Sequence, residues 1–188
     1  TQPDERHELP KVLREISGLT DLSDTQIACV QDEQGTVFIY DLAARKIQSR
    51  IPFGKPGDYE AITRVDDTLF VLRSDGALFE IADYTAPSPK IGVHKLALPT
   101  RDNEGLCYDP FESRLLVSSK SRLGKSDDER QTQGLFAFDL KTRRFDSRPT
   151  VLLDLREVSD GREKIRETKR GKQRVLPSRF LPSSVTVH

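Results

Sequence analysis

The sequence predicts an all-β protein, a β-propeller of four-stranded antiparallel blades. Short apolar runs alternate with turns, no helical period of useful length is present, and the pattern repeats along the chain. Gly18, Ala61 and Gly105 mark the same place in successive repeats and are spaced by 43 and 44 residues. A four-stranded meander repeated at this spacing is typical of propeller blades. We therefore expect about three blades and the first strand of a fourth.

Each repeat contains four runs rich in Val, Ile, Leu and Phe, bounded by Gly, Asp, Pro and Ser. The blades are expected at about 15–53, 58–99 and 103–155, followed by a polar insertion at 156–179 and the start of a fourth blade at 180–188. The charge-rich insertion is expected to be a solvated helix or loop on the rim. A β-sandwich is the alternative fold, but it does not explain why a small residue followed by Leu or Ile returns at each step.

The composition excludes some functions and limits others. Lys plus Arg and Asp plus Glu number 30 each among 188 residues, so no overall positive field favours nucleic acid. No run approaches the roughly 20 apolar residues of a membrane-spanning helix. Three blades alone would leave sheet faces and an edge strand unpaired. We therefore expect missing C-terminal sequence or another chain to complete the ring.

The two cysteines and the absence of common motifs say little about activity. Cys29 and Cys107 lie in apolar runs without a CxxC partner, so we expect buried free thiols rather than a metal or redox site. The sequence contains no GxSxG elbow, P-loop, GxGxxG or HExxH motif. Whether the protein is an enzyme stays open.

One position of the repeat predicts a polar site. In a propeller the first strand of each blade lines the central channel, so equivalent residues converge on one axis. Polar residues occupy that position in every repeat, namely Ser17, Glu60, Glu104 and Ser183. Glu60 and Glu104, with Asn103 and Asp58 nearby in sequence, form the oxygen-rich set that Ca²⁺ prefers. The alternative is that these groups only bind backbone amides or water.

Two basic residues end second strands near the same face. Arg73 and Lys120 are expected to line the channel and could contact an anion, although solvated strand ends are the commoner case. His94 falls in the outer strand of the second repeat, where a surface position is expected.

Five segments carry a resemblance to a known family: Leu13–Leu19, Val30–Gly35, Gly57–Ile62, Arg73–Gly76 and Asn103–Asp109. Together they resemble the bacterial SdiA-regulated family over residues 8–155 and again at 180–188. The resemblance implies a six-bladed propeller in an exported or envelope-associated protein. More distantly the sequence is similar to phytase, paraoxonase and strictosidine-synthase-like propellers, in which carboxylates that begin inner strands hold calcium. Ala61 stands where the SdiA-regulated family usually has glycine.

These observations give two functional hypotheses. The first is a periplasmic, envelope-associated or extracellular propeller that binds a small ligand or protein partner at the channel mouth, with Ca²⁺ as a candidate ion in the channel. The second, which rests on the distant likeness, is a metal-dependent hydrolase of phosphoesters or lactones.

Overall fold

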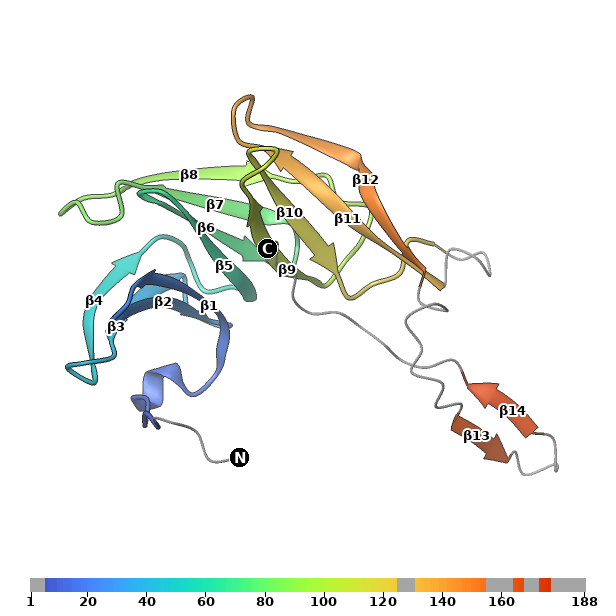
Figure 1. The fold of residues 1–188 in the computed structure, drawn as a ribbon, viewed down its shortest axis with the longest axis horizontal. Helices are drawn as coiled ribbons and strands as arrows, with labels where there is room; N and C mark the ends of the chain where they lie inside the picture. Colours follow the sequence, from blue (N-terminus) through green and yellow to red (C-terminus); the bar gives the residue numbers. More distant parts are fainter. Residues whose placement is uncertain (1–5, 125–130, 155–163, 168–172, 177–188) are drawn as a thin grey trace.

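The computed structural model describes residues 6–124, 131–154, 164–167 and 173–176. Three four-stranded antiparallel sheets follow one another along the chain, and a separate two-stranded pair comes after them. Within each four-stranded sheet the spatial order of the strands is the order of the sequence, as a propeller blade requires (Figure 1). The expected opening strand of a fourth blade at 180–188, with Ser183, lies outside the described residues.

The strands agree with the runs that the sequence predicts. The first sheet contains β1 (Ile16–Ser23), β2 (Gln26–Gln31), β3 (Thr36–Asp41) and β4 (Lys46–Pro52). The second contains β5 (Tyr59–Val65), β6 (Thr68–Arg73), β7 (Ala77–Ala82) and β8 (Lys90–Lys95). The third contains β9 (Asn103–Asp109), β10 (Arg114–Ser119), β11 (Thr132–Asp139) and β12 (Arg144–Asp154). A single 3-10 turn, η1 (Lys11–Leu13), precedes β1.

The first strands of the three sheets lie closest to one another. β1 contacts β5, and β5 contacts β9, whereas β4, β8 and β12 lie on the outside (Figure 1). β2 and β6 carry unbroken runs of buried residues, and β4 and β8 are largely exposed. The sheets therefore radiate from their inner strands.

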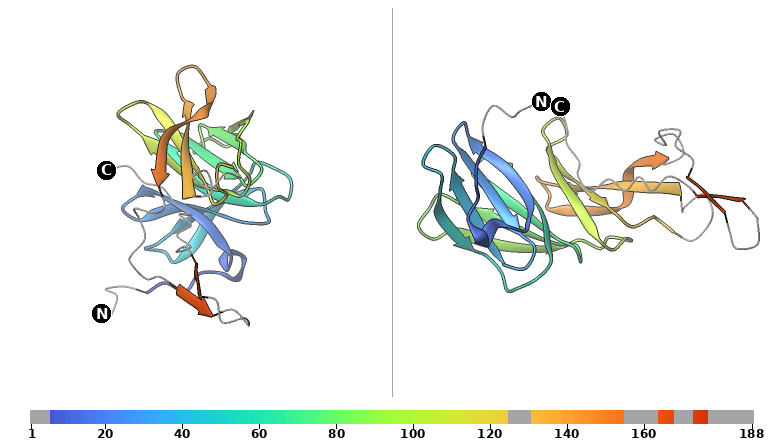
Figure 2. Two further views of the ribbon diagram at one scale, coloured as in Figure 1. Left: turned by 90° about the vertical axis from the view of Figure 1, so that its right-hand side faces the viewer. Right: turned by 90° about the horizontal axis from the view of Figure 1, so that it is seen from below.

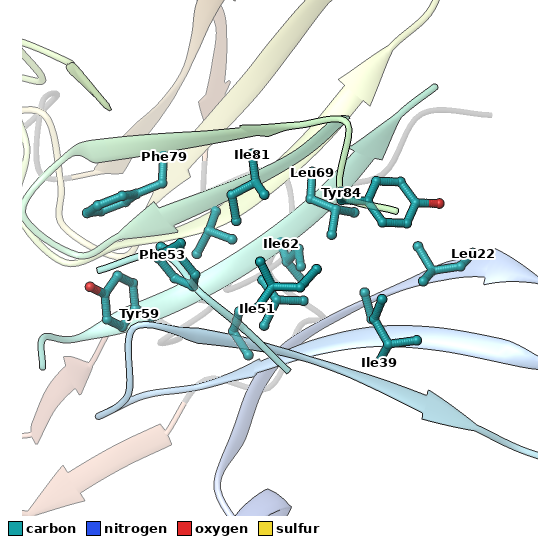
Figure 3. Packing of buried hydrophobic residues seen from close by; sticks show 14 of the residues in the cluster. Leu22, Ile39, Ile51, Phe53, Tyr59, Ile62, Leu69, Phe79, Ile81 and Tyr84 are labelled. Carbon is teal, nitrogen blue, oxygen red and sulfur yellow. The ribbon is translucent and has the colours of Figure 1, made fainter. Parts of the chain in front are cut away.

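Each sheet uses one face to pack on the next. One core contains Val30 of β2 and Val71 of β6, and joins the first two sheets. Figure 2 shows these two sheets beside each other, and Figure 3 shows Ile51 and Ile62 among the residues of this core. A second core contains Leu72 of β6 and Val117 of β10, and joins the second and third sheets. Successive residues of a strand point to opposite faces, so neighbouring residues of β6 serve different cores. We call the face toward the following sheet the forward face and the other the rear face.

The N-terminal segment covers the rear face of the first sheet. Leu13 is 2% exposed and packs with Cys29, Phe38 and Tyr40. Cys29 and Cys107 are both free and buried, as the sequence predicts. Burial raises the pKa of each thiol to about 11, so both remain protonated at neutral pH.

A polar contact joins the outer parts of the second and third sheets. His94 of β8 lies 2.7 Å from a carboxylate oxygen of Glu80 on β7, and the other oxygen accepts a 2.5 Å hydrogen bond from Arg143. The His94 ring also contacts Phe138 of β11, with centroids 4.9 Å apart. His94 is thus in the expected outer strand, where it binds across the blade interface.

Two segments differ from expectation. β12 begins at Arg144, earlier than the run near Thr150 suggested, and its pairing with β11 is interrupted around Pro149. Proline has no N–H, so it fits such an interruption in an outer strand. Within the insertion, β13 (Lys164–Glu167) and β14 (Gln173–Leu176) pair antiparallel rather than forming a helix or loop.

The β-branched residues Ile165 and Val175 occupy partner positions in that pair, which favours a strand despite the surrounding charge. Within the parts of the chain just described, no helix has the length and apolar character needed to cross a membrane.

Candidate functional site

Ser17, Glu60 and Glu104 each lie at a β-bulge in the innermost strand of their sheet. In β1 the pairing with β2 passes from Ile16 directly to Gly18, which leaves Ser17 out of the register. The same interruption leaves out Glu60 in β5 and Glu104 in β9. A bulge changes the direction of its side chain and is common beside functional sites. The repeat therefore presents three re-aimed polar side chains at the same end of neighbouring strands.

The Ser17 hydroxyl links the first two sheets. It donates a 2.5 Å hydrogen bond to the backbone carbonyl of Tyr59, the first residue of β5. The bulge of the first blade thus fixes the strand that carries Glu60.

Glu60 is the most perturbed carboxyl group of the site. Its pKa is raised to about 7, first because burial penalises the charged form. The negative charge of Asp58, a hydrogen bond to Asp58 and the charge of Glu104 raise it further, while Lys120 lowers it. Glu60 therefore exchanges a proton near neutral pH, and part of the rise in its pKa comes from the charge of Glu104 on the adjacent blade.

Glu104 differs because it has a cationic partner. The Lys120 ammonium donates a 2.7 Å hydrogen bond to Glu104, whose side chain is 13% exposed. Lys120 follows β10, which pairs with β9, so the antiparallel register brings the two residues together. The hydrogen bond to Glu104 raises the pKa of Lys120. Lys120, predicted to line the channel, thus neutralises Glu104 and leaves Glu60 with Asp58.

Asn103 holds two blades together. Its side chain is fully buried, its Nδ2 donates to the carbonyl of Ser74 at 2.8 Å, and its Oδ1 accepts from the Thr100 hydroxyl at 3.0 Å. Ser74 belongs to the turn after β6, so this amide ties the second blade to the inner strand of the third.

Arg73 ends β6 with its guanidinium engaged inside the second blade. It donates to both oxygens of Asp75, at 2.9 and 2.8 Å, and lies over the Phe79 ring at 5.6 Å. Glu104 and Lys120 form an ion pair, and both of them, together with Asp58, act electrostatically on Glu60. The side chains of Ser17, Asn103 and Arg73 are occupied by partners within the protein.

The fit to calcium is partial. Ca²⁺ takes six to eight oxygen ligands. In the described residues, no group of three or more His, Cys, Asp or Glu side chains is placed to hold a metal ion. Glu104 already pairs with Lys120 and would have to release it to join Asp58 and Glu60 at an ion. A metal role for Glu60, Glu104, Asn103 and Asp58 remains a prediction.

Sequence reasoning predicted that Ser17, Glu60 and Glu104 line the channel, but it did not predict that each of them lies at a β-bulge. The available signal was the recurring triplet of a polar residue, Gly or Ala, and Leu or Ile. It also missed the pairing of Lys120 with Glu104. The signal for that pair was the position of Lys120 directly after the strand that pairs with the start of β9.

Replacing Glu60 by glutamine should reduce the pH dependence of stability. The raised pKa means that the folded state binds a proton more tightly than the unfolded state, so wild-type stability falls as the pH rises from about 4.5 to about 7. Urea unfolding at pH 5 and pH 8 should show Glu60→Gln more stable than wild type at pH 8 by about 1–2 kcal/mol, after allowance for partial solvent screening. An equal effect at both pH values would contradict the raised pKa.

Comparisons with known proteins support the fold. No protein-family model and no curated protein sequence matches this chain. The chain is similar to one in the crystal structure of the mitotic checkpoint complex, with 12% identity and a TM-score of 0.51 over 74% of this chain and 37% of that one. It is also similar to one in the crystal structure of the nidogen/laminin complex, with 16% identity and a TM-score of 0.51 over 73% of this chain and 48% of that one.

At these identities the likeness concerns the fold alone, and this chain spans less than half of either neighbour. Both neighbours are β-propeller-type proteins. Three four-stranded meanders radiating from adjacent inner strands define the same class. The chain is an all-β protein built of β-propeller blades.

Proposed function

We propose that this chain is part of a β-propeller that binds a small ligand or protein partner at the mouth of its channel, where the inner strands begin. The observation that carries the proposal is the set of three successive bulges, which present Ser17, Glu60 and Glu104 at one end of neighbouring blades. Glu60 adds a carboxyl group with a pKa of about 7, because burial, Asp58 and Glu104 raise that pKa by more than Lys120 lowers it. Such a perturbed group is more common at binding and catalytic sites than elsewhere.

The further details of the proposal rest on resemblance. The likeness to the SdiA-regulated family supports a six-bladed ring and an exported, envelope-associated location, and it rests on the sequence motifs alone. Both similar solved structures are complexes, which is compatible with a protein partner. Ca²⁺ is the candidate ion for Asp58 and Glu60, whose carboxylates would be its ligands. A cation there would offset the repulsion that raises the pKa of Glu60.

Calorimetric titration of Ca²⁺ into the metal-stripped full chain tests this site. Because Ca²⁺ requires ionised Glu60, its affinity should increase about tenfold between pH 6 and pH 8 if the ion binds there. Glu60→Gln should abolish binding, whereas Glu112→Gln, at an exposed residue between β9 and β10, should leave it unchanged. Absence of binding, or binding unaffected by Glu60→Gln, removes Ca²⁺ from the proposal.

A metal-dependent hydrolase is the second candidate. It is favoured by one observation, the pKa of about 7 at Glu60, which suits a general acid or base at neutral pH. A panel of phosphomonoesters and lactones should then be turned over by the wild type and by Glu112→Gln but not by Glu60→Gln. Turnover that survives Glu60→Gln would place the active site elsewhere, and no turnover on any substrate would leave the binding function.

A further inference from the structure

The forward face of the third sheet has the character of a covered interface. It contains Cys107 of β9, which is aligned across the sheet with Leu116 of β10 and Ala137 of β11. Leu116 is 6% exposed and Cys107 is 8% exposed. Neither belongs to the core clusters formed by the described sheets and the N-terminal segment. The corresponding faces of the first two sheets are the ones that pack on the following blade.

Two buried polar atoms on the same face lack a partner. Within the described part of the chain, the Ser118 hydroxyl and the Gln133 carbonyl oxygen Oε1 are buried without a hydrogen-bond partner, and each of these residues is 2% exposed. Ser118 takes the place that Val30 and Leu72 occupy in the earlier sheets, where both pack against the next blade. Buried polar atoms are rarely left unpaired in native proteins. A neighbouring segment with its own polar groups would satisfy them.

The two described blade interfaces share a backbone hydrogen bond. The first residue of an inner strand donates its N–H to the carbonyl just after the second strand of the preceding blade. Tyr59 donates to Asp32 at 2.8 Å, and Asn103 donates to Ser74 at 3.2 Å. In the third sheet the equivalent carbonyl belongs to Lys120.

The Lys120 carbonyl already has a donor. It accepts a 3.3 Å hydrogen bond from Nε2 of Gln133. The residue that aligns with Tyr59 and Asn103 in the last repeat is Pro182, which precedes Ser183. Proline has no N–H and cannot make the shared bond. The side chain of Gln133 therefore supplies the bond that a proline at this place would lack.

From these observations we infer that the forward face of the third sheet is the docking surface for residues 180–187 of this chain, as the inner strand of a fourth blade. The interface continues the pattern of the two before it. Ile62 and Leu106 point back into the preceding cores, and each follows the small residue of its repeat. Val185 follows Ser184 in the same way. Strand alternation then directs Val185 and Val187 toward Cys107, and Ser184 and Thr186 away from it.

Cysteine cross-linking in the full chain tests this orientation. Single cysteines at 184, 185, 186 and 187 are oxidised under mild conditions, and disulfides are mapped by mass spectrometry. Val185→Cys and Val187→Cys should form a disulfide with Cys107. The matched variants Ser184→Cys and Thr186→Cys should not, and none should link to Cys29 behind the first sheet. Equal yields at all four positions, or no link from 185 or 187, would overturn the inference.

A second measurement needs no new disulfide. The double variant Val185→Asp with Val187→Asp should weaken docking and raise the alkylation rate of Cys107 by about tenfold or more, because burial of two valines is lost. Cys29 serves as an internal control and should react at its original rate, which also shows that the fold is intact. An unchanged rate at Cys107 would mean that another element covers this face. The outcome does not depend on the proposed ligand site.

Discussion

Phe79→Ala is expected to destabilise the fold by about 3–5 kcal/mol. Phe79 is 6% exposed and lies in the core between the first two blades (Figure 3). Its ring contacts Phe53, with centroids 5.1 Å apart, and Tyr59, with centroids 5.6 Å apart. Removing the ring leaves a cavity among aromatic side chains from both blades and removes the surface over which Arg73 lies.

Phe111→Ala is the matched control. Phe111 is 77% exposed, so the same substitution should change stability by no more than about 0.5 kcal/mol. Urea unfolding of both variants, followed by far-ultraviolet circular dichroism, gives the comparison. Similar losses in the two variants would contradict the assignment of Phe79 to an interblade core.

Gly18→Ala is expected to cost about 1–3 kcal/mol, although alanine is among the smallest possible changes. A Cβ atom at Gly18 would lie 2.8 Å from Cα of Ala61 and 2.9 Å from the backbone nitrogen of Ile62. Both atoms belong to the backbone of β5, so the inner strands of the first two blades would have to separate. Because Ser17 bridges the same strands, we also expect the surroundings of Glu60 to change.

Gly92→Ala separates crowding from the general effect of replacing a strand glycine. Gly92 lies in β8, and the nearest atom to a Cβ there is Cβ of Glu80 at 3.8 Å, an ordinary contact. Thermal unfolding should show Gly92→Ala close to the wild type and Gly18→Ala clearly less stable. Equal melting temperatures for the two variants would mean that β1 and β5 are farther apart than described.

The sequence was sufficient to predict the blades because their strands are defined locally. Apolar runs and turns such as Ser74-Asp75-Gly76, where Gly76 adopts a φ of +85°, report the meander directly. The site depends on contacts between residues far apart in the chain. That Lys120 pairs with Glu104, and that Asn103 binds the turn at Ser74, follows from strand register and blade packing. Neither is visible in local composition.

The bulges, too, were only partly predictable from the local sequence. The recurring small residue at Gly18, Ala61 and Gly105 marked the right positions, and at Gly18 the inner strands of the first two blades do approach each other closely. An alternating pattern does not reveal that one residue has left the register, because the flanking apolar residues are unchanged. The strand pair formed by 164–167 and 173–176 was not predicted for a related reason, since the surrounding charge concealed the β-branched residues at 165 and 175.

The central claim is that neighbouring blades place Glu60 and Glu104 together at one end of their inner strands. A carboxyl-detected NMR titration of the full chain, with Glu60 assigned by substitution, measures this directly. Glu60 should titrate with a pKa of about 7, and Glu104→Gln should lower that pKa because a nearby negative charge is removed. A Glu60 that titrates near 4.5, and does so whether or not residue 104 is charged, would contradict the convergence of the blades.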